Sequence, residues 1–195
     1  MKTLEEVSTG RRLAFRSLHV QQIAILAVLI ALEVVLSYFS ISTGFLKVTF
    51  TFITVGLIAK WYGPYWGIAV AFIADFLTTM MSGQAYIFPF ALIAVLNALI
   101  FGISYYNRAK LTWWRLLITI FIQLMLSNAI LNTWLLAVYH FLPVPINSIG
   151  DALASPIVWV RVAKQFVMLP IEVLVSYLIL NNAQLEQLRK RIFSK

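Results

Sequence analysis

The sequence predicts an all-α, polytopic membrane protein built as a single six-helix transmembrane bundle. Three observations carry this prediction. Hydrophobic residues make up 62% of the chain and charged residues only 11%, the mean hydropathy is +0.89, and the apolar residues gather in runs close to the roughly 20 residues that a membrane-spanning helix needs. A soluble globular protein is excluded, because its surface would need far more polar residues.

Each apolar run gives one expected span. The runs fall at residues 20–39, 48–62, 65–81, 87–106, 114–140 and 157–180. The second run is short and contains Gly56, and Gly63 with Pro64 predicts a tight turn into the third. With 195 residues and no long polar stretch, the whole chain, 1–195, is one membrane domain.

The basic residues predict the orientation. Twelve of the 15 lysines and arginines fall at the ends of spans that an even span number places on one side, which the positive-inside rule assigns to the cytoplasm. Residues 1–19 are then a retained cytoplasmic segment with no cleaved signal peptide, 20–180 hold the spans, and 181–195 form a basic cytoplasmic tail. The net charge of +8 is a topology signal and does not indicate nucleic-acid binding.

The three remaining cations, Lys47, Arg161 and Lys164, fall on the outer side or in the outer half of the bundle. A charge at the centre of a bilayer costs roughly 2.5 to 3.5 kcal/mol on insertion scales. Such cations need a compensating partner or a function. The sequence therefore predicts a functional site in the outer half of the membrane.

Other polar residues share this depth. At 1.5 Å of rise per residue, five of the six predicted helices bring a strongly polar group to within about 6 to 15 Å of the outer surface. These residues are Glu33, Asp75, Asn97, Asn132, Arg161 and Lys164. A convergent polar layer of this kind is typical of a pocket for a polar solute.

The last span carries its polarity on one helical face. Arg161, Lys164, Gln165 and Glu172 follow the i, i+3, i+4, i+11 spacing of a single stripe. Two alternatives to ligand binding stay open. The two cations can extend outward to lipid phosphates, or they can pair with Glu33 and Asp75 in a buried ion network that only fixes packing.

Two further features complete the candidate set. Tyr86 and Phe88 lie in the loop before the fourth span, where they suit stacking on a flat heterocycle or, equally, an interfacial aromatic belt. Ala27 and Ala31, one turn apart in the first span, form a small-residue face that lets another helix approach closely. That face can serve a partner protein or a neighbouring helix of the same bundle.

The chain lacks the motifs of several enzyme classes. It contains no glycine-rich phosphate loop, no paired-histidine or cysteine metal spacing and no Ser/His/acid set. We therefore predict no catalytic residue, no metal site and no cofactor, and we expect any ATP hydrolysis to come from other subunits. An intramembrane enzyme using Asp75 or Glu33 on a lipid-like substrate is an alternative, as is a purely structural scaffold.

Four stretches carry a resemblance to a known family. They are KVTFTFITVGLIAKWYGPYWGIAVAFIAD at 47–75, AYIFPF at 85–90, LSNAILNTWLLAVY at 126–139 and RVAKQFVMLPIE at 161–172. With six expected spans and the alanine face of span one, the chain resembles the substrate-binding S components of energy-coupling factor (ECF) vitamin transporters. Within that family it looks most like the folate-specific members.

The resemblance implies a function. An S component in a bacterial cell membrane binds its vitamin from outside, docks through the face here formed by Ala27 and Ala31 onto a transmembrane coupling subunit, and works with two ATPase subunits. Folate is the implied ligand, with another anionic vitamin such as pantothenate as the alternative. The implied pocket residues are Lys47, Tyr86, Phe88, Asn97, Asn132, Arg161, Lys164 and Gln165.

Overall fold

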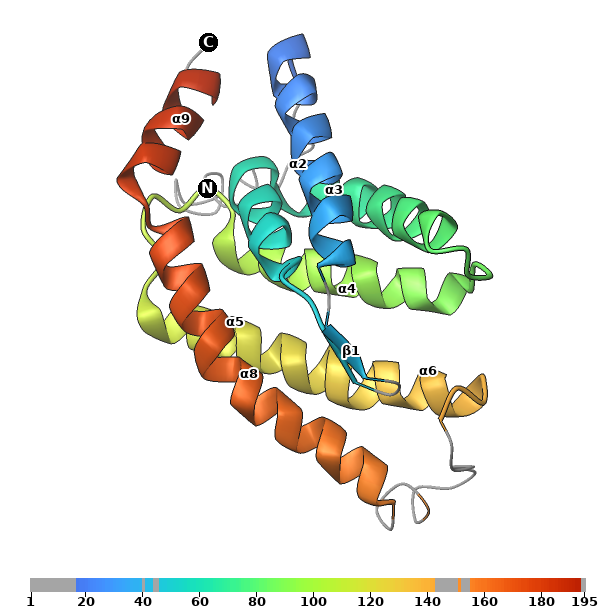
Figure 1. The fold of residues 1–195 in the computed structure, drawn as a ribbon. Helices are drawn as coiled ribbons and strands as arrows, with labels where there is room; N and C mark the ends of the chain where they lie inside the picture. The colour runs from blue at the N-terminus through green and yellow to red at the C-terminus, as the bar shows by residue number, and fades with distance from the viewer. Residues whose placement is uncertain (1–16, 40, 44–45, 143–150, 152–154, 194–195) are drawn as a thin grey trace, which may run out of the picture.

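Most of the described part of the chain is helical (Figure 1). This structure, a computed structural model, describes residues 17–39, 41–43, 46–142, 151 and 155–193, and for 41–43 and 46–48 it describes the backbone alone. In chain order the elements are α2 (Val20–Tyr38), β1 (Ile41–Thr43), β2 (Leu46–Val48), α3 (Phe52–Met81), α4 (Phe88–Tyr105), α5 (Trp113–Ile122), η1 (Gln123–Leu131), α6 (Asn132–Val138), α8 (Pro156–Leu180) and α9 (Ala183–Phe193).

Five helical stretches of the described chain are long and apolar enough to cross a membrane. They are Val20–Tyr38, Phe52–Met81, Phe88–Tyr105, Trp113–Val138 and Pro156–Leu180. Four of them match the predicted runs to within two residues at each end. The α5, η1 and α6 segments form one continuous rod, in which η1 is a π-helical stretch. The chain is a multi-pass membrane protein.

The second and third predicted spans form one helix with a break. Gly63 inside α3 has φ 83° and ψ −175°, a backbone conformation that glycine adopts readily and other residues rarely do. Pro64 follows it at the predicted turn. The count of six membrane crossings is not established, because the part of α3 before Gly63 is only about half as long as a spanning helix needs.

Helix α4 packs closely against this break. A Cβ placed on Gly102 of α4 would lie 2.5 Å from the Cα of Pro64, a distance that no side chain tolerates. Glycine at 102 therefore lets the α4 backbone touch the α3 turn. This contact sets the position of α4 relative to both halves of α3.

The predicted start of the second span, at residue 48, is wrong. Residue 48, expected to begin a helix, belongs to an antiparallel hairpin in which Ser42 pairs with Lys47, and α3 begins only at Phe52. The hairpin segment includes Ile41, Thr43 and Val48, whose β-branched side chains favour strands over helices. The apolar run at 48–62 therefore begins at the end of strand β2 and continues into helix α3.

The predicted basic tail is also more ordered than expected. Residues 183–193 form α9, which folds back onto the first end of α2 (Figure 1). Gln22 donates from Nε2 to the Ile192 carbonyl at 3.1 Å, and Tyr62 donates to the Gln22 carbonyl at 2.8 Å. Phe193 packs edge-on against the Tyr62 ring. Helix α9 is therefore part of the folded bundle.

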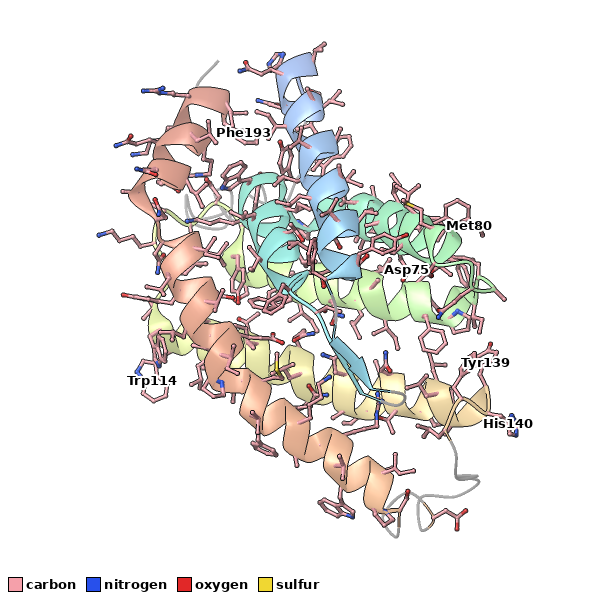
Figure 2. The ribbon with its side chains drawn as sticks, viewed as in Figure 1. Asp75, Met80, Trp114, Tyr139, His140 and Phe193 are labelled. Carbon is pink, nitrogen blue, oxygen red and sulfur yellow. The ribbon has the colours of Figure 1, made fainter. Side chains whose placement is uncertain are left out.

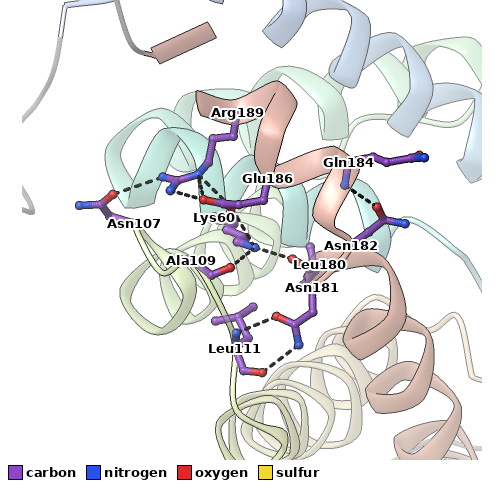
Figure 3. Close-up of polar contacts among 10 residues, drawn as sticks. All are labelled: Lys60, Asn107, Ala109, Leu111, Leu180, Asn181, Asn182, Gln184, Glu186 and Arg189. Carbon is purple, nitrogen blue, oxygen red and sulfur yellow. Dashed lines mark hydrogen bonds and ion pairs between the residues drawn. The ribbon is translucent and has the colours of Figure 1, made fainter. Parts of the chain in front are cut away.

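A buried lysine organises this end of the molecule (Figure 3). Lys60 of α3 is only 1% exposed, and its Nζ donates to the carbonyls of Leu180 and Ala109. The same ammonium lies 3.5 Å from the Glu186 carboxylate, which also forms an ion pair with Arg189 at 2.6 Å. Lys60 is one of the twelve basic residues that the sequence assigns to the cytoplasmic side, and in the structure it joins α3, the α4–α5 connection and the α8–α9 junction.

Two amide side chains complete the attachment. Asn181 accepts from the Leu111 backbone N–H at 2.7 Å and donates to the Leu111 carbonyl at 2.9 Å. Arg189 also donates to the Asn107 amide oxygen at 3.3 Å (Figure 3). The connection between α4 and α5 is thus held from α8 and from α9.

The Glu186 network makes a pH-dependent contribution to stability. Burial by itself raises the pKa of the Glu186 carboxyl, but hydrogen bonding and charge from Arg189 and Lys60 outweigh burial, and the net pKa is lowered from its usual 4.5. A lowered pKa stabilises the fold above about pH 4.5, and this stabilisation is lost as the pH falls through the folded-state pKa.

We therefore expect the thermal unfolding midpoint of the detergent-solubilised protein to exceed that of the Glu186→Gln variant at about pH 7, and the difference to shrink towards about pH 3.5. A Gln184→Glu variant serves as a control, since position 184 lies on the exposed side of α9. If the difference in unfolding midpoint between the two proteins stayed constant from about pH 7 to about pH 3.5, the lowered pKa of Glu186 would be contradicted.

Candidate functional site

Arg161 is the centre of the candidate site. It lies in α8, is 7% exposed, and points into the bundle. Its Nε donates to Thr133 Oγ1 at 2.9 Å and its Nη2 to Asn132 Oδ1 at 3.0 Å. The guanidinium is thus bound to α6, and the alternative in which Arg161 extends outward to lipid phosphates is wrong. Because both acceptors are neutral, they orient the guanidinium without adding a negative charge.

Lys164 and Gln165 lie one turn further along the same face of α8. Gln165 is buried and Lys164 is half-buried. Lys164 is close enough to Arg161 for the two positive charges to repel each other. A guanidinium and an ammonium on one helix face are groups that suit a ligand that carries negative charge.

Asn97 presents a polar group from α4. Asn97 as a whole is half-buried, but its Oδ1 atom is buried and hydrogen-bonds to no other group in the described part of the chain. A buried amide oxygen without a protein partner is costly, and such atoms commonly meet a ligand or ordered water. Asn97 therefore has the hydrogen-bonding capacity expected of a pocket residue.

Tyr86 and Phe88 are placed against α3. The Tyr86 ring packs edge-on against Phe76 at 5.4 Å, and the Phe88 ring against Phe72 at 6.3 Å. Burial, followed by the nearby Asp75 carboxylate, raises the pKa of Tyr86. Phe88 is 54% exposed. These ring contacts join both aromatic residues to α3, whereas the hydrogen bonds of Arg161 join α8 to α6.

Lys47 occupies β2 opposite Ser42, and its side chain falls outside the described part of the structure. The hairpin nevertheless connects the ends of α2 and α3 that are remote from α9 (Figure 1). Lys47 is therefore placed at the end of the bundle opposite Lys60.

The carboxyl group of Glu33 faces an apolar cavity. The cavity is lined otherwise by small and aliphatic residues of α3 and α4, including Gly67, Ala71 and Ala98. Asp75 is close enough to interact electrostatically with Glu33; Figure 2 labels Asp75 on the second half of α3. In the described residues no group of three His, Cys, Asp or Glu side chains could hold a metal ion.

Ala27 and Ala31 face away from the bundle. Both are exposed, and their neighbours Val28 and Leu32 are exposed as well. The buried side of α2 carries Leu26 instead. The alternative in which the alanine face packs against another helix of this chain is wrong for the described residues, so the face is available to a partner.

Sequence reasoning missed Thr133 and the π-helical stretch. Thr133 is buried and holds Arg161 Nε, but a threonine among apolar residues gives no hydropathy signal. Its position directly after Asn132 is the one indication. The π-helix η1 has no sequence pattern of its own, although such stretches often occur at functional sites.

Comparisons with known proteins all point to one family. The family model described as "ECF transporter, substrate-specific component" matches residues 21–180. The folate transporter FolT of Leuconostoc mesenteroides is 36% identical over 189 residues, which cover 96% of this chain and 99% of the relative. The folate transporter FolT of Clostridium novyi is 31% identical over 156 residues, with 78% of this chain and 83% of the relative covered.

A solved structure agrees with these matches. The crystal structure of FolT bound with folic acid superimposes with a TM-score of 0.74 at 31% sequence identity, covering 85% of this chain and 95% of the solved chain. The similarity therefore extends to the arrangement of the helices as well as to the sequence.

The contact between Arg161 and Thr133 can be tested directly. Thr133→Val keeps the side-chain shape but removes the acceptor for Arg161 Nε, and we expect it to destabilise the protein by about 1 to 2 kcal/mol. Thr133→Ser keeps the hydroxyl and should retain most of the stability. The check is the thermal unfolding midpoint in detergent; equal midpoints for the two variants would show that the hydrogen bond contributes nothing.

Proposed function

Since the chain belongs to the substrate-specific components of ECF transporters, we propose that it binds folate from outside the cell and delivers it to an ATP-dependent importer. The observation that carries this proposal is the buried Arg161 beside Lys164, in a chain similar over most of its length to folate transporters. Family membership also favours transport over the enzyme alternative based on Asp75 or Glu33.

Folate chemistry suits the candidate residues. Its glutamate tail carries two carboxylates, for which Arg161 offers a bidentate guanidinium and Lys164 or Lys47 a second charge. Its flat pterin needs aromatic surfaces and amide hydrogen bonds, which other pocket residues supply. The proposed pocket comprises Lys47, Tyr86, Phe88, Asn97, Asn132, Arg161, Lys164 and Gln165. Either end of folate can face inward in this arrangement.

The proposed transport cycle uses the exposed face of α2. Ala27 and Ala31 dock onto a transmembrane coupling subunit, two ATPase subunits supply the energy, and the S component topples in the bilayer to release folate inward. We propose six membrane crossings, with the short first half of α3 counted as one, in a bacterial plasma membrane. Both termini are then cytoplasmic, with 1–19 before the spans and 181–195 after them.

The alternative ligand is another anionic vitamin such as pantothenate. It would use the same two cations but has no pterin to place against an amide such as Asn97. Mass spectrometry of small molecules that co-purify with the detergent-solubilised protein distinguishes the two. Pantothenate without folate in the purified sample would contradict the folate assignment.

Lys164→Ala should weaken folate binding by at least about tenfold, because it removes a positive charge from a partly buried anion site. Isothermal titration with the purified protein measures the dissociation constant, and the unfolding midpoint shows whether the variant is folded. Lys190→Ala on the exposed side of α9 is the matched control. A folded Lys164→Ala protein with unchanged affinity would remove Lys164 from the site.

Ala27→Trp and Ala31→Trp should each abolish folate uptake while leaving folate affinity unchanged, because an indole holds the partner helix away from α2. Uptake is measured in cells that express the complete transporter, and affinity with the purified chain. Leu92→Trp, at an exposed position of α4, controls for the effect of a large lipid-facing side chain. Normal uptake by both alanine variants would contradict docking through this face.

A further inference from the structure

A group of buried polar atoms lies inward of the candidate site. They are Asn97 Oδ1, Tyr105 Oη, Gln123 Oε1, Ser127 Oγ and Glu172 Oε2, and none forms a well-aligned hydrogen bond within the described residues, although the Thr119 hydroxyl lies close to Tyr105 Oη. Four of these five residues are more than nine-tenths buried. The proposed transport function uses only Asn97. The other four are polar side chains whose presence inside the bundle is not explained by ligand binding or docking.

These atoms come from elements that pack together. Asn97 and Tyr105 lie on α4, Gln123 and Ser127 on η1, and Glu172 on α8; η1 contacts both α4 and α8. Tyr105 is close enough to Glu172 to interact with its charge. The polar atoms therefore come from η1 and from the two helices, α4 and α8, that pack against it.

The group continues the candidate site towards the Lys60 end. On α8, Glu172 follows Arg161 by 11 residues on the same face, about 16 Å along the helix. On η1, the Ser127 carbonyl accepts the backbone N–H of Asn132, so Ser127 lies one π-helical turn inward of a residue that binds Arg161. Gln123 lies one further turn inward.

Leaving these atoms without partners would be too costly. A buried polar group that loses its hydrogen bond costs about 1 to 3 kcal/mol, and five such groups would consume much of the roughly 5 to 15 kcal/mol that stabilises a typical domain. Buried polar groups of this kind are usually joined by ordered water, which makes two to four hydrogen bonds. Hydroxyls that donate and accept, together with amide and carboxyl acceptors, match water, which does both.

We propose that Tyr105, Gln123, Ser127 and Glu172, with Asn97 at the outer end, bind a chain of ordered water molecules between α4, η1 and α8. Water fits better than a metal ion, because Lys164 on the same α8 face already lies within electrostatic range of Glu172. The proposal does not depend on which vitamin the protein binds. Water between the helices also lets α4 move against η1 and α8 without breaking direct side-chain hydrogen bonds.

X-ray radiolytic footprinting tests this proposal, because hydroxyl radicals generated from a bound water label the side chain beside it. Tyr105 is 0% exposed and Phe101, one turn away on α4, is 3% exposed; their ring centroids are 5.2 Å apart. Phe101 is therefore a matched control with no polar group on its ring. We expect Tyr105 to be labelled at least about fivefold faster than Phe101 in the purified full chain.

Apolar substitution provides the second arm. In a Gln123→Leu/Ser127→Ala variant, labelling of Tyr105 should fall to the level of Phe101. Labelling of Tyr105 no faster than that of Phe101 in the unsubstituted protein would overturn the proposal, and so would labelling of Tyr105 that is unchanged by the double substitution in a folded protein.

A double-mutant cycle covers the case in which the apolar variant does not fold. Tyr105→Phe and Ser127→Ala each remove one water-binding hydroxyl with little change of shape, and neither removes a formal charge. If a shared water joins them, their effects on the unfolding free energy are non-additive. Strict additivity, together with equal labelling of Tyr105 and Phe101, would show that the region is dry.

Discussion

The absence of water in the hydrocarbon core of a membrane is the constraint on which this structure depends. Every polar group inside a span must find a partner within the protein or in water that the protein encloses. Arg161 meets this requirement through Thr133 and Asn132, and Lys60 meets it through two backbone carbonyls and Glu186. Each of these contacts joins segments that are distant in sequence, so the polar residues specify which helices lie side by side in an otherwise apolar bundle.

The two ends of the bundle use this constraint differently. At the Lys60 end, a carboxylate lies against the cation and three segments are tied together, an arrangement that favours a closed and rigid end. At the Arg161 end, the described hydrogen bonds go to neutral acceptors, and Lys164 adds a second positive charge nearby. This asymmetry agrees with a protein that receives an anion from one side of the membrane.

The buried polar atoms between α4, η1 and α8 extend the same logic inward. Glu172 follows Arg161 along one face of α8, and Gln123 and Ser127 belong to the π-helical stretch η1. A π-helix changes which backbone groups pair and so alters which side chains face the interior. The polar interior is thus concentrated between helices that meet at η1, whereas α3 and α4 meet through the small residues Gly102 and Pro64.

The sequence by itself determined the class of protein, the position of most spans and the turn at Gly63, because hydropathy and backbone preference are local properties. It also placed Arg161 and Asn132 in the same outer layer of the bundle, since the rise of a helix is fixed. Only the tertiary structure decided that Thr133 holds Arg161, that Lys60 is buried, and that Ala31 faces outward. It also turned the expected tail into α9 and the start of the second span into a hairpin. Rotation of a helix and the choice of its neighbours depend on packing between residues far apart in the chain, and that information is not present in any single segment.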